Sequence, residues 1–409
     1  MTDPQELVES TFRERFGRAP EWRLRVPGRL EVFGKHTDYA GGRSLVAAVP
    51  RGFVFAADAG GQGKVDVTDA LSCARFICRI GDPDPHITAG WHRYALTVVR
   101  RLIRNFPSAD LSSRVVFASN LPSAAGISSS SALIIGIAEA LIAAGRLENT
   151  AEWKANIRSI EDRIAYLGCI ENGAAFASLP GDDGVGTHGG SEDHAAIVTS
   201  RAGMLQQFSF SPIRCERAVP MPPGWTFAVM SSGVPARKTG LARTIYNRLA
   251  WRVQDIKAEW VKDHPEDGRS VAELVYSGAL DDFPLKRHLA VRLEHLRAED
   301  ARVVAAADAF AQRDISRIGE LAAASQLDAE QSLDNQVPET IDLVALARQA
   351  GASAASAFGA GWGGSVWALV REDTAEQFLA EWSDAYKVKY PRRDNVGFVS
   401  PPSNGLQRL

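Results

Sequence analysis

The sequence predicts an α+β protein with more than one domain. A chain of 409 residues is longer than a single hydrophobic core usually accommodates. Short β-rich runs and longer helical patterns both occur along it, and hydrophobic residues make up 45% of the chain, as in globular proteins. A cluster of prolines between positions 212 and 223 interrupts these patterns. We therefore expect an N-terminal lobe over residues 1–210 and a C-terminal lobe over residues 211–409.

The N-terminal half is expected to combine helices with strands. A mixture of charged and apolar positions predicts an amphipathic helix over Thr2–Phe16. A second helix is predicted over Trp91–Asn105, with Arg100, Arg101 and Arg104 on its outer side. Three runs are predicted to be strands, the second of them interrupted at Pro50–Gly52: Trp22–Val26, Leu45–Ala57 and Arg114–Ala118.

The second half is dominated by helical patterns. Its glycine and proline content predicts a loop over Leu179–Gly190, and a short strand is expected at Thr226–Met230. Helical periodicity then covers Leu241–Trp260 and Pro284–Gln326. The last regular unit is a helix followed by a strand within Pro338–Val370.

Charge and cysteine content argue against several classes of protein. The formal net charge is −3 and the pI is near 6.3, so we expect no overall attraction to nucleic acid or to an anionic membrane. The four cysteines show no zinc-like spacing, which favours structural thiols in a reducing compartment. The N-terminus has no signal-like apolar segment, and no apolar run approaches the roughly 20 residues of a membrane span. We expect a cytoplasmic protein.

A serine-rich segment lies between a predicted strand and a predicted helix. Residues 122–131 read Pro-Ser-Ala-Ala-Gly-Ile-Ser-Ser-Ser-Ser, and the apolar run Ala132–Ala144 predicts a buried helix behind them. Small residues before a helix N-terminus let backbone N–H groups point at phosphate, and hydroxyls of the first turn can complete the coordination of Mg²⁺. The alternative is a serine-rich helix cap without a ligand.

Two further segments are rich in glycine. Residues 359–364 read Gly-Ala-Gly-Trp-Gly-Gly and lie between an apolar helix and an apolar strand. Residues 28–42 hold several polar side chains between glycines, and binding residues often collect in such loops. A nucleotide-binding P-loop does not fit here, because His36 follows Lys35 where that motif requires Ser or Thr.

These three segments, in this order, resemble the motifs of the GHMP kinases, the family of galactokinase, homoserine kinase, mevalonate kinase and phosphomevalonate kinase. Residues 28–42, Gly-Arg-Leu-Glu-Val-Phe-Gly-Lys-His-Thr-Asp-Tyr-Ala-Gly-Gly, are similar to the galactokinase signature GR-x-N-x-IGEHTDY-x-x-G. Residues 122–132 resemble P-x-x-x-GLSSSAA, and residues 359–364 resemble GGGFGG. The first of these segments points to the galactokinase branch.

Further anchors extend the resemblance from about residue 20 to the end of the chain. Residues 186–194 resemble GTPCGIMDQ, residues 231–248 resemble NS-x-V…YN-x-R, and residues 332–342 resemble the SCPELD region. The resemblance implies a two-lobed GHMP kinase fold, with an N-terminal mixed α/β lobe, a C-terminal ferredoxin-like lobe and the active site in the cleft between them. It also implies ATP and Mg²⁺ as cofactors and a small-molecule sugar as substrate, bound by a monomer or weak dimer.

The resemblance implies roles for individual residues. Arg29 would stabilise charge in the transition state, and Asp193 would accept or polarise the proton of the sugar hydroxyl. Mg²⁺ would be held by Ser130 and Glu171, although the chain between Glu171 and Asp193 is longer than is usual in the family. The sugar would contact Lys35, His36, Asp38, Gly190 and Tyr246. ATP would contact Pro122, Ala125, Gly126, Ile127, Ser128, Ser129, Ser130, Gly361 and Gly363.

The implied reaction is phosphorylation of the anomeric C1 hydroxyl of galactose or a related sugar. Lys35 departs from the family, because galactokinases carry a glutamate there that faces the exocyclic 6-hydroxyl. A lysine cannot accept a hydrogen bond but pairs well with a carboxylate, which suggests a uronic acid such as galacturonate. Alternatively, Lys35 turns to solvent or pairs with Glu31, which itself replaces the family's asparagine. Other family residues beside Asp193 are also replaced, at His188, Ser191, Glu192 and His194, so galactose itself does not follow.

Two other functions remain open. A galactokinase-like sensor would bind sugar and nucleotide without turnover, but Arg29, Asp193 and the serine-rich segment are all present in this chain. A GHMP kinase for a non-sugar alcohol, such as mevalonate or homoserine, is the second alternative. The run His36–Tyr39 favours a sugar over that alternative.

Overall fold

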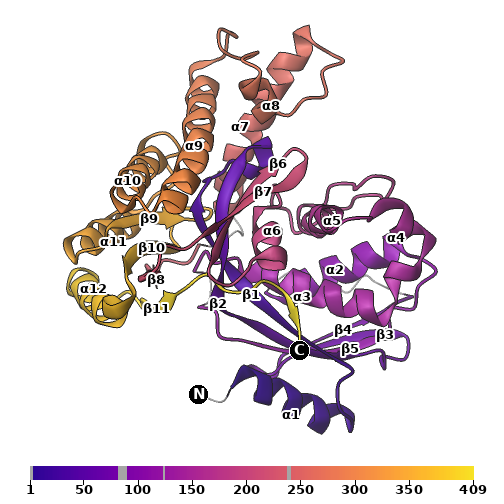
Figure 1. The fold of residues 1–409 in the computed structure, drawn as a ribbon. Coiled ribbons are helices and arrows are strands. Elements are labelled where there is room, and N and C mark those ends of the chain that lie inside the picture. Colours follow the sequence, from indigo (N-terminus) through magenta and orange to yellow (C-terminus); the bar gives the residue numbers. More distant parts are fainter. Residues whose placement is uncertain (1–2, 82–89, 123–124, 237–240) are drawn as a thin grey trace.

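The structure, a computed structural model, describes residues 3–81, 90–122, 125–236 and 241–409, with the backbone alone over residues 241–245. The first residue of the predicted N-terminal helix and residues 123 and 124 of the serine-rich segment lie outside this part of the chain. Figure 1 shows two sheets, each accompanied by helices. This arrangement confirms the predicted α+β fold in two lobes.

The N-terminal lobe is built on a sheet of eight strands. Six of them follow the order β12-β1-β2-β5-β3-β4, while β6 pairs with the first part of β2 and β7 pairs with β6. All neighbours are antiparallel except β3 and β5. The strands are β1 (Trp22–Phe33), β2 (Arg43–Asp58), β3 (Lys64–Asp69), β4 (Arg75–Arg79), β5 (Ser113–Ser119), β6 (Met204–Phe210), β7 (Ile213–Pro220) and β12 (Gln407–Arg408).

Strand β2 is continuous, although an interruption was expected at Pro50–Gly52. The backbones of β1 and β2 approach each other closely there. A Cβ at Gly52 would lie 2.3 Å from the carbonyl oxygen of Val26, which leaves no room for a side chain. The pairing register shifts between Pro27 and Arg29 on the partner strand. Glycine therefore allows the two strands to stay paired through the bend instead of ending the strand.

Helices cover both faces of this sheet (Figure 1). The apolar helix α3 packs against β1 and β2 and is buried along most of its length, as its composition predicted. Arg101 on α2 is fully buried, contrary to the predicted outer position, because its guanidinium bonds to Asn105 and to the carbonyl oxygen of Ala174. The helices are α1 (Pro4–Phe16), α2 (His92–Asn105), α3 (Ser129–Ala144), α4 (Ala151–Asn156), α5 (Ile160–Asn172) and α6 (Glu192–Thr199), with short 3₁₀ turns η1 (Asp38–Ala40) and η2 (Leu147–Asn149).

The C-terminal lobe is built on a four-stranded antiparallel sheet in the order β11-β8-β10-β9. The predicted helical stretch 284–326 is two helices, because Arg313 takes a left-handed conformation (φ 59°) between them. The strands are β8 (Trp225–Ser231), β9 (Ala354–Phe358), β10 (Ser365–Arg371) and β11 (Gly397–Ser400). The helices are α7 (Leu241–Asp263), α8 (Val271–Tyr276), α9 (Arg287–Gln312), α10 (Ile315–Gln331), α11 (Pro338–Gln349) and α12 (Ala375–Lys389), with a 3₁₀ turn η3 (Glu372–Thr374).

The two lobes are joined by the connecting chain and also by a shared hydrophobic cluster. The hairpin β6–β7 spans the predicted boundary at residue 210, and the change of sheet comes between Pro220 and Trp225. One hydrophobic cluster also combines side chains of both sheets, and in it the rings of Phe33 and Trp367 lie 6.1 Å apart. This shared core packs the two lobes against each other. Among the described residues, no helix has both the length and the apolar character that a membrane span requires.

Candidate active site

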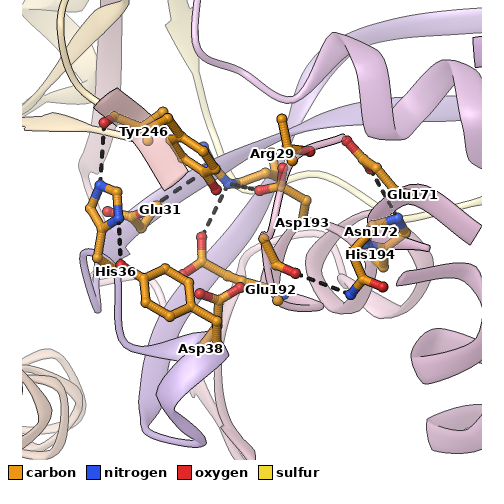
Figure 2. Close-up of a pocket in the computed structure, with 16 residues that line it drawn as sticks. Arg29, Glu31, His36, Asp38, Glu171, Asn172, Glu192, Asp193, His194 and Tyr246 are labelled. Atoms are coloured by element: carbon orange, nitrogen blue, oxygen red, sulfur yellow. Dashed lines mark hydrogen bonds and ion pairs between the residues drawn. The ribbon is translucent and has the colours of Figure 1, made fainter. Parts of the chain in front are cut away.

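A cavity lined by polar side chains lies where the lobes meet (Figure 2), and we call it the polar cavity. The N-terminal lobe supplies the side chains of β1, of the loop over residues 34–42 (the early loop) and of the start of α6. Helix α7 and the loop after β9 close it from the other lobe. Its walls are Arg29, Glu31, His36, Asp38, Tyr39, Glu171, Asn172, Thr187, Gly189, Gly190, Glu192, Asp193, His194, Tyr246, Gly359 and Ala360.

Arg29 lies at the centre of the charged groups in this cavity. Its Nε is 2.7 Å from Oδ1 of Asp193 and 3.2 Å from Oε1 of Glu192, and a terminal nitrogen is 3.7 Å from Oε2 of Glu31. Another terminal nitrogen donates to the carbonyl oxygen of Gly126 at 3.0 Å. Burial by itself would lower the pKa of Arg29, but the three carboxylates raise it, so the guanidinium stays charged.

Asp193 reaches the cavity from the first turn of α6. It faces Arg29 on one side, and on the other its Oδ2 accepts a hydrogen bond from the hydroxyl of Ser131 at 3.1 Å. Ser131 belongs to the first turn of α3, so the aspartate touches the serine-rich segment directly. The structure therefore brings together the two residues expected to be catalytic, next to the segment expected to hold phosphate.

The two expected Mg²⁺ ligands are also neighbours. The hydroxyl of Ser130 lies 3.5 Å from Oε1 of Glu171, and Oε2 of Glu171 lies 3.2 Å from Nε2 of His194. In the described part of the chain, no group of three or more His, Cys, Asp or Glu side chains is arranged to hold a metal ion by itself. One hydroxyl and one carboxylate fit Mg²⁺ when phosphate oxygens and water supply the other ligands.

The serine loop, residues 125–131, presents an uncapped helix end. Ser128 takes a left-handed conformation (φ 58°), and its side chain makes no capping bond to the first turn of α3. The N–H groups of that turn consequently have no side-chain partner at the cap position. Such an end fits a phosphate group, because the N–H groups and the helix dipole both favour negative charge.

A second cavity, the aromatic cavity, begins at the serine loop. It shares Arg29 and Ala360 with the polar cavity, so the two cavities adjoin at these residues. Sequence reasoning missed its walls, because Trp91 and Tyr94 were interpreted only as part of a helical pattern. Its lining residues are Arg29, Phe53, Asp69, Leu71, Gly90, Trp91, Tyr94, Phe117, Ser119, Leu121, Gly126, Ser128, Ser129, Ser130, Leu133, Ala236 and Ala360.

The third glycine-rich segment packs on the serine loop. Ser365 donates a hydrogen bond to the carbonyl oxygen of Ala125 at 2.6 Å, and a Cβ at Gly126 would lie 3.5 Å from Cα of Gly364. Gly361 and Gly363, both expected to contact ATP, have no room for a side chain beside the protein backbone. A Cβ on them would lie 2.3 Å from the carbonyl oxygen of Asn335 and 2.5 Å from that of Val234.

Two other expected ATP contacts, Ala125 and Ile127, support the serine loop, and Pro122 is a third outside the cavity walls. Ala125 accepts the bond from Ser365, and the carbonyl oxygen of Ile127 accepts a hydrogen bond from the N–H of Arg29 at 3.2 Å. Pro122 stands at the edge of the described segment. The walls of the two cavities contain Gly126 and Ser128–Ser130 but not these three residues.

The early loop brings His36 and Asp38 into the polar cavity. Nδ1 of His36 lies 2.9 Å from the hydroxyl of Tyr39, and Asp38 accepts the N–H of Glu192 at 3.3 Å. Gly190 must lack a side chain, because a Cβ there would lie 2.4 Å from Oδ2 of Asp38. Burial raises the pKa of Asp38, and Asp193 raises it further.

Tyr246 reaches the same cavity from α7. Its ring centroid is 5.9 Å from that of His36, and burial raises the pKa of its hydroxyl well above the usual value. Four of the five residues expected to contact sugar, namely His36, Asp38, Gly190 and Tyr246, therefore line one cavity.

Lys35 is the exception. Its side chain is 1% exposed, and its Nζ bonds to the hydroxyl of Ser325 on α10 at 2.6 Å. Ser325 in turn donates to Glu299 on α9 at 2.8 Å. Burial alone would raise the pKa of Glu299, but Lys35 and other cations lower it to about 2. The lysine therefore neither lines the polar cavity nor turns to solvent. A buried ammonium group requires polar or charged partners, and Ser325 and Glu299 provide them.

Helix α9 anchors the early loop through two further side chains. Arg292 donates to the carbonyl oxygen of His36 at 2.5 Å and to the hydroxyl of Tyr39 at 3.1 Å. Asp300 accepts the N–H of Arg43, just beyond the loop, at 2.7 Å. Glu299 itself accepts the N–H of Gly34 at 3.0 Å. Nothing in the local sequence of the loop signals these anchors.

Models of known families match three parts of the chain. The GHMP kinases N terminal domain matches residues 93–176, the GHMP kinases C terminal model matches residues 306–388, and the galactokinase galactose-binding signature matches residues 10–59. The chain therefore belongs to the GHMP kinase family, whose members use ATP. Within that family it is of the galactokinase type.

Solved structures agree on the fold. Lactococcus lactis galactokinase, solved in complex with galactose, matches with a TM-score of 0.81 and 21% identity, over 99% of this chain and 100% of that one. Methanococcus jannaschii mevalonate kinase matches with a TM-score of 0.60 and 14% identity, over 93% and 98%. L. major mevalonate kinase, in complex with R-mevalonate, matches with a TM-score of 0.52 and 16% identity, over 93% and 96%.

Proposed function

We propose that this protein is an ATP-dependent sugar kinase that phosphorylates the anomeric C1 hydroxyl of galactose or a related sugar. The observation that carries the proposal is the position of the Arg29–Asp193 pair. Arg29 lines both cavities and lies 2.7 Å from Asp193, at the junction of a polar chamber with a chamber of aromatic residues and serines. A sugar in the first chamber and a nucleotide in the second would meet at this pair.

The chemistry asked of the protein is alignment and charge neutralisation. A bond forms between the sugar oxygen and the γ-phosphorus of ATP, the bond from that phosphorus to the leaving ADP oxygen breaks, and the hydroxyl proton passes to Asp193. Arg29 stabilises the negative charge of the transferring group. Ser130 and Glu171 would hold Mg²⁺, which when bound would supply further positive charge beside the phosphates.

The aromatic cavity provides a surface for the adenine ring. The rings of Trp91 and Phe117 stand edge to face with centroids 5.0 Å apart, and Tyr94 lies one turn further along α2. Ser128–Ser130, at the uncapped N-terminus of α3, also line this cavity, which suits the phosphate groups. We propose that the adenine ring binds beside Trp91 and Tyr94 and that the phosphates bind at the N-terminus of α3.

The charge of the polar cavity supports a neutral sugar rather than a uronic acid. Five carboxylates line it, and Arg29 is already surrounded by three of them. The galacturonate hypothesis depended on Lys35, whose ammonium group bonds to Ser325 instead. A sugar carboxylate would therefore enter without the cation expected to receive it.

The proposal is tested by ADP release with MgATP in the presence of galactose, mevalonate or homoserine, with NMR assignment of the phosphorylated carbon. We expect turnover of galactose and a C1 phosphate, and loss of both in Asp193→Asn. Turnover of mevalonate or homoserine alone would replace the sugar with a non-sugar alcohol. Nucleotide binding without any turnover would identify a sensor instead.

We further propose a cytoplasmic enzyme that works as a monomer or weak dimer. The exposed free thiols of Cys73 and Cys215 are suited to a reducing compartment, where they would stay unpaired. Light scattering across a range of protein concentrations tests the oligomeric state, and we expect a mass close to 44.2 kDa at low concentration.

A further inference from the structure

Glu31 and Glu192 are two carboxyl groups of the polar cavity that the proposed reaction does not use. Glu31 extends from β1, two residues after Arg29, and Glu192 begins α6, one residue before Asp193. Both side chains are about 4% exposed and both line the cavity (Figure 2). By the resemblance to galactokinases, they replace an asparagine and a methionine, so the chain carries two added acidic groups here.

The partners of the pair leave part of its hydrogen-bonding capacity unused. Glu192 receives a hydrogen bond from the hydroxyl of Ser44 at 2.6 Å and an ion pair from Arg29 at 3.2 Å. Glu31 is 3.7 Å from Arg29 through Oε2, and no N–H or O–H group of the described residues donates to its Oε1. Carboxylate oxygens are acceptors, so a hydrogen-bond donor of a ligand in this cavity would be bound favourably beside the pair.

The two acids also lie within hydrogen-bonding reach of each other. Two carboxylates at this distance can bond only when one of them holds a proton. Burial raises the pKa of Glu31 against the opposing effects of Arg29 and Lys35, and burial together with Glu31 raises the pKa of Glu192. Burial therefore favours a proton within the pair, whereas Arg29 and Lys35 favour a negative charge on it.

We propose that Glu31 and Glu192 determine the substrate class of this enzyme, by accepting a hydroxyl or amino substituent of the sugar and rejecting a carboxylate. The inference rests on the proposed sugar kinase function. A hydroxyl or ammonium group of the sugar can donate a hydrogen bond to a carboxylate of the pair. A carboxylate supplies none and meets like charge in a buried site, an arrangement that costs several kcal/mol.

The test compares sugars that differ only at carbon 6: galactose, 6-amino-6-deoxygalactose and galacturonate, with 2-amino-2-deoxygalactose as a further amino sugar. For the wild type we expect kcat/KM for galacturonate at least about 100-fold below that of the better of the other sugars. In Glu31→Gln and Glu192→Gln, we expect this ratio to shrink at least about tenfold. The ratio is measured within each variant, so a common loss of kcat through Arg29 cancels.

Glu139→Gln is the matched control. Glu139 is an equally buried glutamate that bonds to an arginine, with Nε of Arg163 at 2.8 Å, but it lies along α3 away from both cavities. Its removal should leave the ratio between the sugars within about twofold of the wild type. The comparison of the hydroxyl and amino sugars then identifies which donor the pair prefers.

Two kinds of failure are distinguishable. If the wild type phosphorylates these sugars but both glutamine variants keep the ratio within about twofold, the inference is overturned while the kinase function stands. Preference of the wild type for galacturonate overturns it as well. If the wild type phosphorylates none of the sugars, the proposed function fails and the inference fails with it.

Discussion

The early loop and the serine loop face each other across the site, but they are held by different means. The serine loop is fixed by its own helix and by the glycine-rich backbone of residues 359–364 packed against it. The early loop is fixed by charged side chains of α9, which accept or donate at Gly34, His36 and Arg43. The serine loop is thus supported mainly by backbone, its own and that of residues 359–364, whereas the early loop depends on charged side chains of a distant helix.

The difference predicts that mutations near each loop will affect the binding of a different substrate. Changes to the anchors of the early loop should act on sugar binding and on stability, and changes around the serine loop should act on ATP. Asp193 touches Arg29 and Ser131 at once, so its loss should affect the chemical step itself.

The largest expected effect is that of Asp193→Asn. The amide cannot take the hydroxyl proton, so we expect kcat to fall roughly 1,000-fold, within the range of a lost general base. Binding of ATP should stay within about threefold of the wild type, because the aspartate does not line the aromatic cavity. Steady-state kinetics and nucleotide titration check both. A variant that retained a tenth of the activity would remove Asp193 from the proton transfer.

Glu299→Gln should follow in size. The pKa of Glu299 is lowered from 4.5 to about 2, which corresponds to about 3 kcal/mol of stability at about 1.36 kcal/mol per pKa unit. This contribution is complete above pH 4.5 and is lost as the pH falls toward 2. The variant should therefore be less stable than the wild type at pH 7, by an amount that shrinks on acidification, and its KM for sugar should rise more than its KM for ATP.

Denaturant unfolding between pH 3 and pH 7 measures this difference. Glu294→Gln provides the control, since Glu294 lies on the same helix but is exposed. An equal loss of stability at every pH would mean that Lys35 and its neighbours do not hold Glu299 in its charged form.

Trp91→Ala tests the proposed nucleotide site. Loss of the ring should raise KM for ATP roughly tenfold, because stacking on an aromatic side chain contributes about 1–3 kcal/mol per base. The KM for sugar should change little. Trp251→Ala removes a partly exposed tryptophan outside the two cavities and should leave both values unchanged. A rise in the sugar KM alone would place the nucleotide base elsewhere.

The smallest expected effect is a pH-dependent gain of stability in Glu192→Gln. The folded protein raises the pKa of Glu192, chiefly by burial, so it binds this proton more tightly than the unfolded chain does. The wild type therefore loses stability as the pH rises from about 4.5 toward the raised pKa, by about 1.4 kcal/mol per pKa unit. The variant lacks this loss. Its Tm relative to the wild type should increase between pH 5 and pH 8, and a decrease would contradict the raised pKa.

The same contrast explains how much could be predicted from sequence. The strand, serine loop and apolar helix α3 are consecutive in the chain, so composition and periodicity were enough to predict them. Lys35 could not be placed in this way, because the side chains that receive it, Ser325 and Glu299, come from distant helices. Arg101 was placed on the wrong face for a similar reason, since its partners include a loop after α5.

The family motifs predicted which residues lie near Asp193 but not how those residues interact with one another. Arg29, His36, Asp38 and Tyr246 do line one cavity, as the resemblance implied. The pairing of Glu31 with Glu192 was not predicted, although both had been noted as departures from the family pattern. Two substitutions far apart in sequence carry no signal of contact until the fold brings β1 and α6 together.

The distance along the chain between the early loop and its anchors also concerns the order of synthesis. Gly34 bonds to Glu299, 265 residues later, and the carbonyl oxygen of His36 bonds to Arg292, 256 residues later. During translation the loop emerges early and must wait for most of the chain before these partners exist. A ribosome-bound fragment that ends before α9 should therefore lack the sugar site. It should also lack the support of the serine loop, because Ser365 follows Ala125 by 240 residues, so affinity for either substrate should appear only once the C-terminal lobe has been made.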